Sequence, residues 1–193
     1  MLHNNKYEIL RHYLGDYNQA IYGRNLIGKV SLSQKAIAIA LNKLEKGGIL
    51  RSKKQGNIKF FSLNTDNPEI KDIILSLEIT KKLEFLKKHR KITNIFKTDD
   101  RIVGIFGSYA KSIETKDSDI DIFIIGNKLK EDYGKRGKLF DMKISIKYFS
   151  EKDFINLVKN KNSLVKEIIK DHILIFGLEN FINTIWSNHY GFN

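Results

Sequence analysis

The fold of this chain is decided by one stretch of its sequence, Gly107-Ser108-Tyr109-Ala110-Lys111-Ser112-Ile113-Glu114-Thr115-Lys116-Asp117-Ser118-Asp119-Ile120-Asp121-Ile122-Phe123-Ile124-Ile125-Gly126. An apolar run at residues 102–106 leads into it, and a second apolar run begins at residue 120. Short apolar runs bounded by glycine and polar residues are typical of buried strands. The stretch therefore predicts a strand, a turn with a short helix, and a second strand.

Two aspartates, Asp119 and Asp121, stand at the start of the second predicted strand. Residues i and i+2 of a strand point to the same face, so we expect the two carboxylates side by side. Such charges repel each other unless a cation lies between them, and Mg²⁺ prefers oxygen ligands of this kind. Gly107 allows the backbone to approach a phosphate, and Ser108 offers a hydroxyl beside a helix N-terminus. The pattern predicts a metal site next to a phosphate site.

This spacing resembles the signature of the DNA polymerase beta-type nucleotidyltransferases in their minimal form, which is Gly-Ser, ten residues, then Asp-x-Asp. The resemblance covers residues 101–149. It implies a mixed β-sheet with flanking helices, Mg²⁺ and a nucleoside triphosphate as ligand or substrate, and catalytic roles for Asp119 and Asp121. In the alternative interpretation, Ser108 only caps a helix and the aspartates are a solvated strand start.

The same resemblance implies a third catalytic carboxylate on a neighbouring strand, which should be residues 143–149. That segment has no acid in its interior, and Ser145 stands where the third carboxylate is implied. Asp141 lies four residues earlier, roughly 13 Å along an extended chain, so the two cannot occupy the same position. Two interpretations stay open: Asp141 is the third catalytic acid in a different register, or the third carboxylate is absent.

The composition indicates a globular protein of one medium domain or two small ones, with 193 residues, 41% of them hydrophobic and 29% charged. No apolar run approaches the length of a membrane span and no signal-peptide pattern is present, so we expect a cytoplasmic protein that does not engage a membrane. The absence of cysteine excludes disulfides and cysteine-ligated zinc.

The net charge of +12 belongs almost entirely to the first half of the chain. Residues 1–98 hold 19 Lys and Arg against 8 Asp and Glu, a net of +11, whereas residues 99–193 hold 15 against 14, a net of +1. This asymmetry indicates a polyanion as partner of the first half. A basic surface that is only solvated is the alternative.

The first half has the pattern of three short helices followed by a basic hairpin. Helical spacing of apolar residues predicts helices near residues 7–14, 23–30 and 33–46, and Ser33 is a favourable N-cap for the third. Residues 49–50 and 59–63 read as strands around a basic turn. Residues 31–63 resemble winged helix-turn-helix transcription regulators, which implies a DNA-binding domain.

The DNA contacts that this resemblance implies come from the third helix and the hairpin. Gln34 and Lys35 would reach base edges in the major groove, and Lys53, Lys54 and Lys59 would contact backbone phosphates or the minor groove. Ala38 and Ile39 offer no hydrogen bonds at the next exposed positions. A winged helix used for protein contact is therefore the alternative.

A long connecting helix is predicted to start at Asn67-Pro68-Glu69 and to run to about residue 89. It carries two apolar stripes, so it needs two partners. One interpretation is a homodimer that reads two half-sites of DNA. The other is burial between the two domains of one chain. The expected fold class is α+β, with a winged helix-turn-helix domain at residues 1–65, the connecting helix at 66–98 and a nucleotidyltransferase-like domain at 99–193.

Three functional interpretations follow. In the first, a DNA-binding transcriptional regulator binds a nucleoside triphosphate and Mg²⁺ at its second domain. In the second, an active transferase moves a nucleotidyl group to a hydroxyl of a protein (for example a partner toxin), a small molecule or an RNA. In the third, the chain is an interaction module whose acidic pair is vestigial. Whether the chain is an enzyme depends on the third carboxylate.

Overall fold

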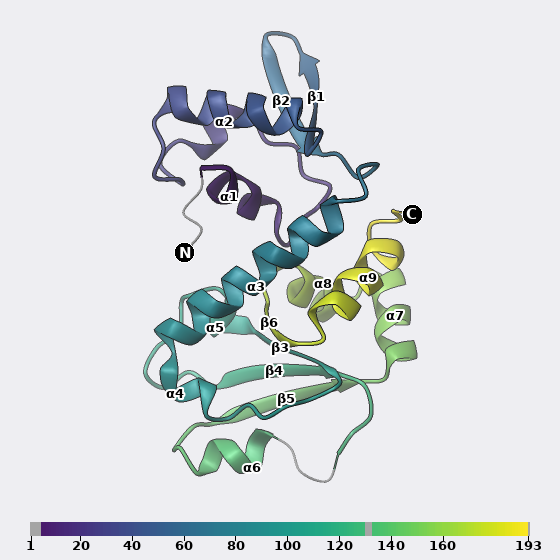
Figure 1. The fold of residues 1–193 in the computed structure, drawn as a ribbon. Helices are drawn as coiled ribbons and strands as arrows, with labels where there is room; N and C mark the ends of the chain where they lie inside the picture. The colour runs from purple at the N-terminus through teal and green to yellow at the C-terminus, as the bar shows by residue number, and fades with distance from the viewer. Residues whose placement is uncertain (1–4, 130–132, 193) are drawn as a thin grey trace. The chain divides into compact units, whose positions relative to one another are not determined.

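The structure, a computed structural model, describes residues 5–129 and 133–192 (Figure 1). The chain forms two compact units, residues 1–77 and residues 78–193. Both contain helices and a β-sheet, which confirms the predicted α+β class. No helix among the described residues has the length and apolar character needed to cross a membrane.

The first unit contains α1 (Asn5–Leu10), η1 (Arg11–Tyr13), η2 (Gly23–Leu26), α2 (Gln34–Lys46), and the antiparallel hairpin of β1 (Leu50–Gln55) and β2 (Ile58–Leu63). Helix α2 begins where the Ser33 hydroxyl accepts a hydrogen bond from the amide of Ala36, as predicted. Its apolar face is buried through Ile37, Leu41 and Leu44. These elements follow the order expected of a winged helix-turn-helix, and that identification stays a prediction.

The second helix predicted for this unit, residues 23–30, is wrong in type and length. The structure has a 3-10 helix there, Gly23–Leu26. Gly28 has a φ of +75°, a left-handed conformation that ends any regular right-handed helix. The first helix is likewise short, because α1 gives way to the 3-10 helix η1 after Leu10.

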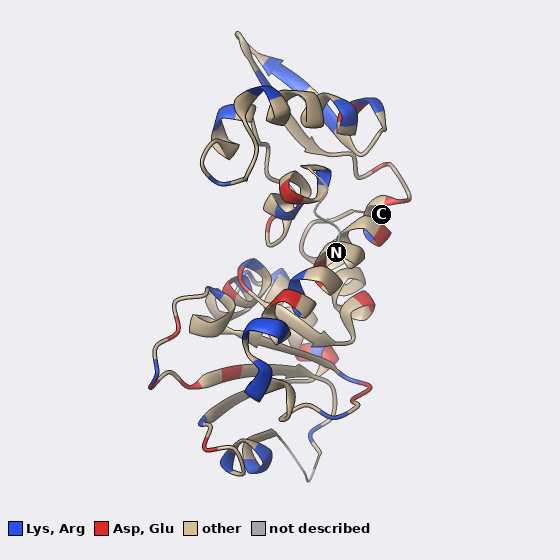
Figure 2. Cartoon of the chain, turned by 60° about the vertical axis from the view of Figure 1, so that its left-hand side comes forward, with Lys and Arg blue, Asp and Glu red and all other residues tan. Residues whose placement is uncertain are grey.

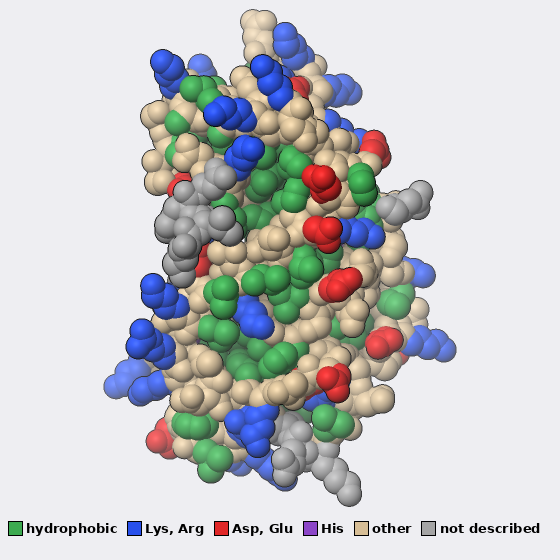
Figure 3. All heavy atoms as spheres, viewed as in Figure 1, with side chains coloured by type: hydrophobic (Ala, Val, Ile, Leu, Met, Phe, Trp, Pro, Cys, Tyr) green, Lys and Arg blue, Asp and Glu red, His purple; other side chains and the backbone are tan. Residues whose placement is uncertain are grey.

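Helix α3 (Ile70–Lys88) is the predicted long helix, and it continues from the first unit into the second. Ile70, Ile74 and Leu77 are buried, and so is Phe85 near its C-terminal end. Hydrophobic side chains also gather on the surface over α3 (Figure 3). Two large apolar side chains of α3, Ile79 and Leu83, have 43% and 53% of their surface exposed. The homodimer stays a prediction.

The second unit is built on a four-stranded mixed sheet of order β5-β4-β3-β6. Strand β3 (Ile102–Phe106) pairs antiparallel with β4 (Ile120–Ile125) and β6 (Ile173–Phe176), while β5 (Ile144–Phe149) pairs parallel with β4. The helices of this unit are α4 (Arg90–Thr93), α5 (Gly107–Ala110), α6 (Tyr133–Lys138), α7 (Glu151–Lys159), α8 (Ser163–Lys170) and α9 (Leu178–Asn188). The predicted strand–turn–helix–strand is thus present as β3, α5 and β4.

The two faces of this sheet carry different side chains because strand residues alternate. On one face, Ile120, Ile122 and Ile124 join a core with Phe85 of α3 and Ile92 of α4. On the other face, aromatic rings contact the C-terminal helices. Phe123 lies 5.7 Å from Phe181 of α9, and Phe149 lies 5.7 Å from Phe154 of α7, measured between ring centroids. Asp121 and Ser145 belong to this second, aromatic face.

A buried polar cluster ties α3 to the C-terminal part of the second unit. The carboxylate of Glu78 lies 3.2 Å from Nε2 of His172 and 3.3 Å from Nζ of Lys81. Nδ1 of His172 lies 2.9 Å from the carbonyl oxygen of Ile168. Glu78 and His172 are each only 1% exposed. Such a cluster is stabilising only while each charge keeps its partners.

We expect the stability of the protein to fall in acid because of Glu78. Burial alone would raise the pKa of this carboxyl, but the charges of Lys81 and His172 and their hydrogen bonds outweigh burial and hold the pKa at about 2. A carboxyl whose pKa is lowered on folding stabilises the protein above its ordinary value, 4.5, and this contribution is lost as the pH falls towards 2.

Urea unfolding between pH 5 and about pH 3 measures this effect. The slope of unfolding free energy against pH should be smaller in Glu78→Gln than in the wild type. The exposed Glu69→Gln serves as the control and should keep the wild-type slope. Equal slopes in all three proteins would show that Glu78 does not titrate as described.

Candidate functional site

The acidic pair lies at one end of the second sheet, where β3 ends and β4 begins. Asp121 is the second residue of β4 and is paired with Phe106, the last residue of β3. On its other side it is paired with Ser145 of β5. Asp119 precedes β4 by one residue and is exposed. The carboxylate of Asp121 therefore lies between the turn that begins at Gly107 and the start of β5.

Gly107 lies directly against Asp121. A Cβ added to Gly107 would lie 2.5 Å from Oδ2 of Asp121, which is closer than such atoms approach. The φ of Gly107 is +70°, a conformation that other residues rarely adopt. The structure thus brings the predicted phosphate-binding glycine and the predicted metal-binding aspartate together. Ser108 follows in the first turn of α5 and is partly buried.

The electrostatic surroundings of Asp121 favour a cation. Burial raises the pKa of Asp121, and the negative charges of Asp119 and Glu167 raise it further. A hydrogen bond from Ser145 and the positive charge of Lys147 act in the opposite direction without cancelling the rise. A divalent ion beside the carboxylate would relieve this repulsion and favour the ionised form of Asp121.

Ser145, and not Asp141, lies beside Asp121 in this structure. Asp121 and Ser145 are opposite each other in the parallel β4–β5 register. Asp141 lies in the turn between α6 and β5, is exposed, and has a φ of +54°. The structure does not bring it into the acidic pair. The absence of a third carboxylate stays a prediction.

Three further charged side chains near Asp121 were missed by the sequence analysis. Lys147 follows Ser145 by two positions in β5 and therefore shares its face. Lys111, directly after α5, forms an ion pair of 2.5 Å with Glu167 of α8. Strand alternation could have revealed Lys147. Nothing local in the sequence predicts that α8 approaches this site.

Asp119 and Asp121 fit one Mg²⁺ that is carried by a triphosphate, because Mg²⁺ commonly uses one or two carboxylates together with phosphate oxygens and water. Among residues 5–129 and 133–192, no group of three or more His, Cys, Asp and Glu side chains is placed to hold a metal. The neutral hydroxyl of Ser145 is a poor substitute for a bridging carboxylate. Within the described ranges, Asp119 and Asp121 are thus candidate ligands for one ion.

The predicted DNA contacts in the first unit are only partly free. Gln34 and Lys35 are exposed in the first turn of α2, and Lys53 and Lys54 are exposed on β1. Lys59 instead forms an ion pair of 2.5 Å with Glu45. Figure 2 shows lysine and arginine in blue along α2 and the hairpin. A groove of about 580 Å³ between these elements is lined by Gln34, Asn42, Asn57, Lys59 and others.

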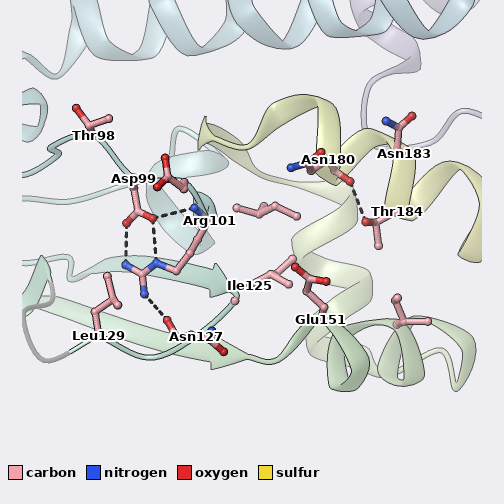
Figure 4. A pocket seen from close by; sticks show the side chains of 14 residues that line it. Thr98, Asp99, Arg101, Ile125, Asn127, Leu129, Glu151, Asn180, Asn183 and Thr184 are labelled. Carbon is pink, nitrogen blue, oxygen red and sulfur yellow. Dashed lines mark hydrogen bonds and ion pairs between the residues drawn. The ribbon is translucent and has the colours of Figure 1, made fainter.

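A second cavity, of about 720 Å³, lies at the end of the sheet away from Asp121 (Figure 4). Arg101 and Asp99 of this cavity are paired with each other: the Arg101 side chain donates two hydrogen bonds to Asp99, and it donates one to the carbonyl oxygen of Asn127. Tyr133 donates a further hydrogen bond to Asp99 at 2.6 Å. Because Arg101, Asp99 and Tyr133 are hydrogen-bonded to one another, we interpret this cluster as a structural feature that stabilises this end of the sheet, and not as a catalytic site.

Comparison with known families supports the nucleotidyltransferase prediction for the second unit. Residues 90–180 match the family model described as "Polymerase beta, Nucleotidyltransferase". The matched segment holds Gly107, Ser108, Asp119, Asp121 and Ser145. No solved structure matches the chain.

One curated relative is "Putative protein adenylyltransferase MJ1547" of Methanocaldococcus jannaschii. It is 41% identical over 78 residues, which are 39% of this chain and 54% of the relative. The chain thus spans about half the length of this relative. The family model does not extend into the first unit.

Proposed function

We propose that this chain is a nucleotidyltransferase that transfers a nucleotidyl group from a nucleoside triphosphate to a hydroxyl group of a protein. The main observation behind this proposal is that Gly107 lies directly against the carboxylate of Asp121. The proposed phosphate-binding turn and the proposed metal-binding carboxylate are therefore neighbours. The family match at residues 90–180 supports nucleotidyl transfer, and the name of the Methanocaldococcus jannaschii relative supports a protein as acceptor. Transfer is thereby better supported than the regulator interpretation that the sequence placed first.

In the proposed reaction, the acceptor oxygen forms a bond to the α-phosphorus while the bond to the bridging oxygen of pyrophosphate breaks. Gly107 and Ser108 hold the phosphate chain through backbone amides and a hydroxyl. Asp119 and Asp121 would hold Mg²⁺, and the ion would supply positive charge beside the phosphate oxygens. Ser145 is not a base at neutral pH, so the hydroxyl proton passes to water. This absence of a positioned base predicts a slow enzyme.

The test is transfer of label from α-labelled triphosphates to protein. The purified chain is incubated with Mg²⁺, each of the four ribonucleoside triphosphates in turn, and proteins co-purified with it, and the acceptor is identified by mass spectrometry. Label on a hydroxyl side chain supports the proposal if no label is incorporated when EDTA is present from the start of the reaction. If the chain neither binds a Mg²⁺–triphosphate complex nor labels any protein, the proposal is wrong.

Ser145→Asp should accelerate transfer. The new carboxylate would lie opposite Asp121 in the β4–β5 register, where it can both accept the acceptor's proton and share a second Mg²⁺. We expect at least about a tenfold rise in transfer rate, since a positioned base contributes that or more. Ser145→Ala is the matched control and should show no rise. Equal rates in the two variants would contradict the assignment of this position.

We further propose that the first unit binds DNA. The observation that favours it is the set of exposed polar side chains on two adjacent elements, with Gln34 and Lys35 on α2 and Lys53 and Lys54 on β1. Phosphate binding by lysines supplies affinity, and side chains at a helix start can reach base edges. Lys59 is not included in the proposed DNA-binding surface because its ammonium group forms an ion pair with Glu45.

Lys53→Ala/Lys54→Ala should weaken DNA binding and lower its salt dependence. If each lysine contacts one phosphate, the slope of log affinity against log salt should fall by about two. Fluorescence anisotropy with a duplex at several salt concentrations measures this. Lys152→Ala/Lys166→Ala removes the same charge from exposed positions of the second unit and should leave the slope unchanged. If both double variants lost the same DNA affinity and salt dependence, the effect would come from net charge alone, and the assignment of Lys53 and Lys54 as DNA contacts would be wrong.

A further inference from the structure

A basic cavity of about 500 Å³ lies at the end of α3, and we call it the basic pocket. It is lined by Lys87, Lys88, His89, Arg90, Lys91, Ile92, Tyr109 and Met142. Tyr109 directly follows Ser108 in α5, and Met142 lies two residues before β5. The basic pocket therefore lies at the same end of the sheet as the acidic pair.

The basic pocket opens on a different face of the sheet from Asp121. Tyr109 and Met142 pack against the core formed by Ile120 and Ile122. Asp121 lies between these two isoleucines in β4, so its side chain points to the opposite face. A ligand in the basic pocket would thus neighbour the nucleotide and metal site without occupying it.

Four cations line the basic pocket. Lys88 forms an ion pair of 3.0 Å with Glu114, which belongs to the loop between α5 and β4. Lys87, Arg90 and Lys91 are exposed, and the described part of the chain contains no carboxylate within ion-pair distance of them. Three unpaired like charges within five residues repel one another, so an anion bound among them would be stabilised.

The remaining lining is flat and apolar. The ring of Tyr109 contacts the ring of His89 edge-on, with centroids 5.5 Å apart, and His89 packs on Phe85 at 4.5 Å. Nε2 of His89 lies 3.5 Å from Oε1 of Glu114, and neither this nitrogen nor Oε2 of Glu114 has a hydrogen-bond partner among the described residues, which is costly for buried polar atoms. Rings and a methionine beside unpaired cations are the combination that binds a base together with its phosphate.

We propose that the basic pocket binds a nucleotide unit, with its phosphate among Lys87, Arg90 and Lys91 and its base against Tyr109 and Met142. The ligand has two sources with this chemistry, a free mononucleotide or one residue of a single-stranded nucleic acid. This inference does not depend on transfer activity, because it concerns binding at residues outside the acidic pair.

The test measures binding to the full chain in EDTA, in an Asp119→Asn/Asp121→Asn background that weakens the metal-dependent site. The probes are fluorescent AMP and a labelled single-stranded oligoadenylate. Lys53→Ala/Lys54→Ala is added so that the first unit contributes less to oligonucleotide binding. We expect Lys87→Ala/Lys91→Ala to weaken binding about tenfold. Lys166→Ala/Lys170→Ala, with the same spacing and exposure, is the matched control and should bind normally.

The two probes separate the sources of the ligand. Binding of both probes indicates a free nucleotide, and binding of the oligoadenylate alone indicates a nucleic acid. Tyr109→Leu should lower the affinity for both probes, because it removes the ring on which the base stacks. It should not change the affinity for inorganic phosphate, measured by its competition with the probes, because the lysines and the arginine are still present. The two measurements thus separate the contribution of stacking from that of charge. If neither probe binds, or if the Lys87→Ala/Lys91→Ala and control variants bind equally, the proposal is overturned. The lysine variants alter only exposed side chains, so folding does not obscure the result.

Discussion

Asp119→Asn/Asp121→Asn should lower nucleotidyl transfer by about a thousandfold or more while the protein stays folded. Asparagine keeps the shape of aspartate but loses the charge that holds Mg²⁺. Asp121 is partly buried and repelled by Asp119 and Glu167, so neutralising it removes an unfavourable interaction. Stability should therefore be unchanged or slightly raised. Initial rates with saturating Mg²⁺–triphosphate, together with urea unfolding, measure both effects.

Two control variants make this result specific. Asp117→Asn alters an exposed acid of the same loop and should keep wild-type activity. Asp141→Asn tests the remaining interpretation of the third acid. Because the structure places Ser145 opposite Asp121 and leaves Asp141 in an exposed turn, we expect little change. A loss with Asp141→Asn as large as that with Asp121→Asn would show that Asp141 joins the site during the reaction.

His172→Leu should destabilise the protein by about 1–3 kcal/mol, the usual cost of leaving a buried polar group without one of its hydrogen-bond partners. It leaves the buried carboxylate of Glu78 with Lys81 alone, at 3.3 Å. It also leaves the carbonyl oxygen of Ile168 without the contact that Nδ1 provides. Urea unfolding at pH 7 measures the change.

The double variant Glu78→Leu/His172→Leu should be less destabilised than the sum of the two single variants. The double variant removes both members of the buried Glu78–His172 contact together, and two leucines can pack at positions that are 1% exposed. Additive losses would mean that the two side chains stabilise the unit independently of each other.

The sequence predicted the parts of the fold that depend on neighbouring residues. Strand β3, the turn at Gly107 and strand β4 follow from two apolar runs and a glycine, and α2 follows from Ser33 and its apolar spacing. The helix expected at residues 23–30 was wrong because the left-handed conformation of Gly28 outweighs a weak helical pattern. Local preference decides an element only where packing agrees with it.

The site was less predictable than the fold, because its geometry depends on contacts between distant segments. The sequence supplied Gly107, Ser108, Asp119 and Asp121. It left Ser145 and Asp141 as alternatives, since only the β4–β5 register decides which of them faces Asp121. Glu167 of α8 follows Asp121 by 46 positions in the sequence, so no local pattern predicts that the two are near each other. In the structure its charge raises the pKa of Asp121, and its carboxylate forms an ion pair with Lys111. Lys59 likewise gave no sign of its partner Glu45.

The place of β5 at the edge of the sheet has an evolutionary consequence. Its residues hydrogen-bond to one neighbour only, and Ser145 is partly exposed, so exchange of the side chain there should cost little stability. Ser145 is the position at which a third carboxylate would join the acidic pair, and its substitution should thus lower the stability of the unit only slightly. If the proposed transfer activity is correct, descendants of one ancestral chain can gain or lose catalytic speed at this position while the scaffold, the turn at Gly107 and the first unit stay the same.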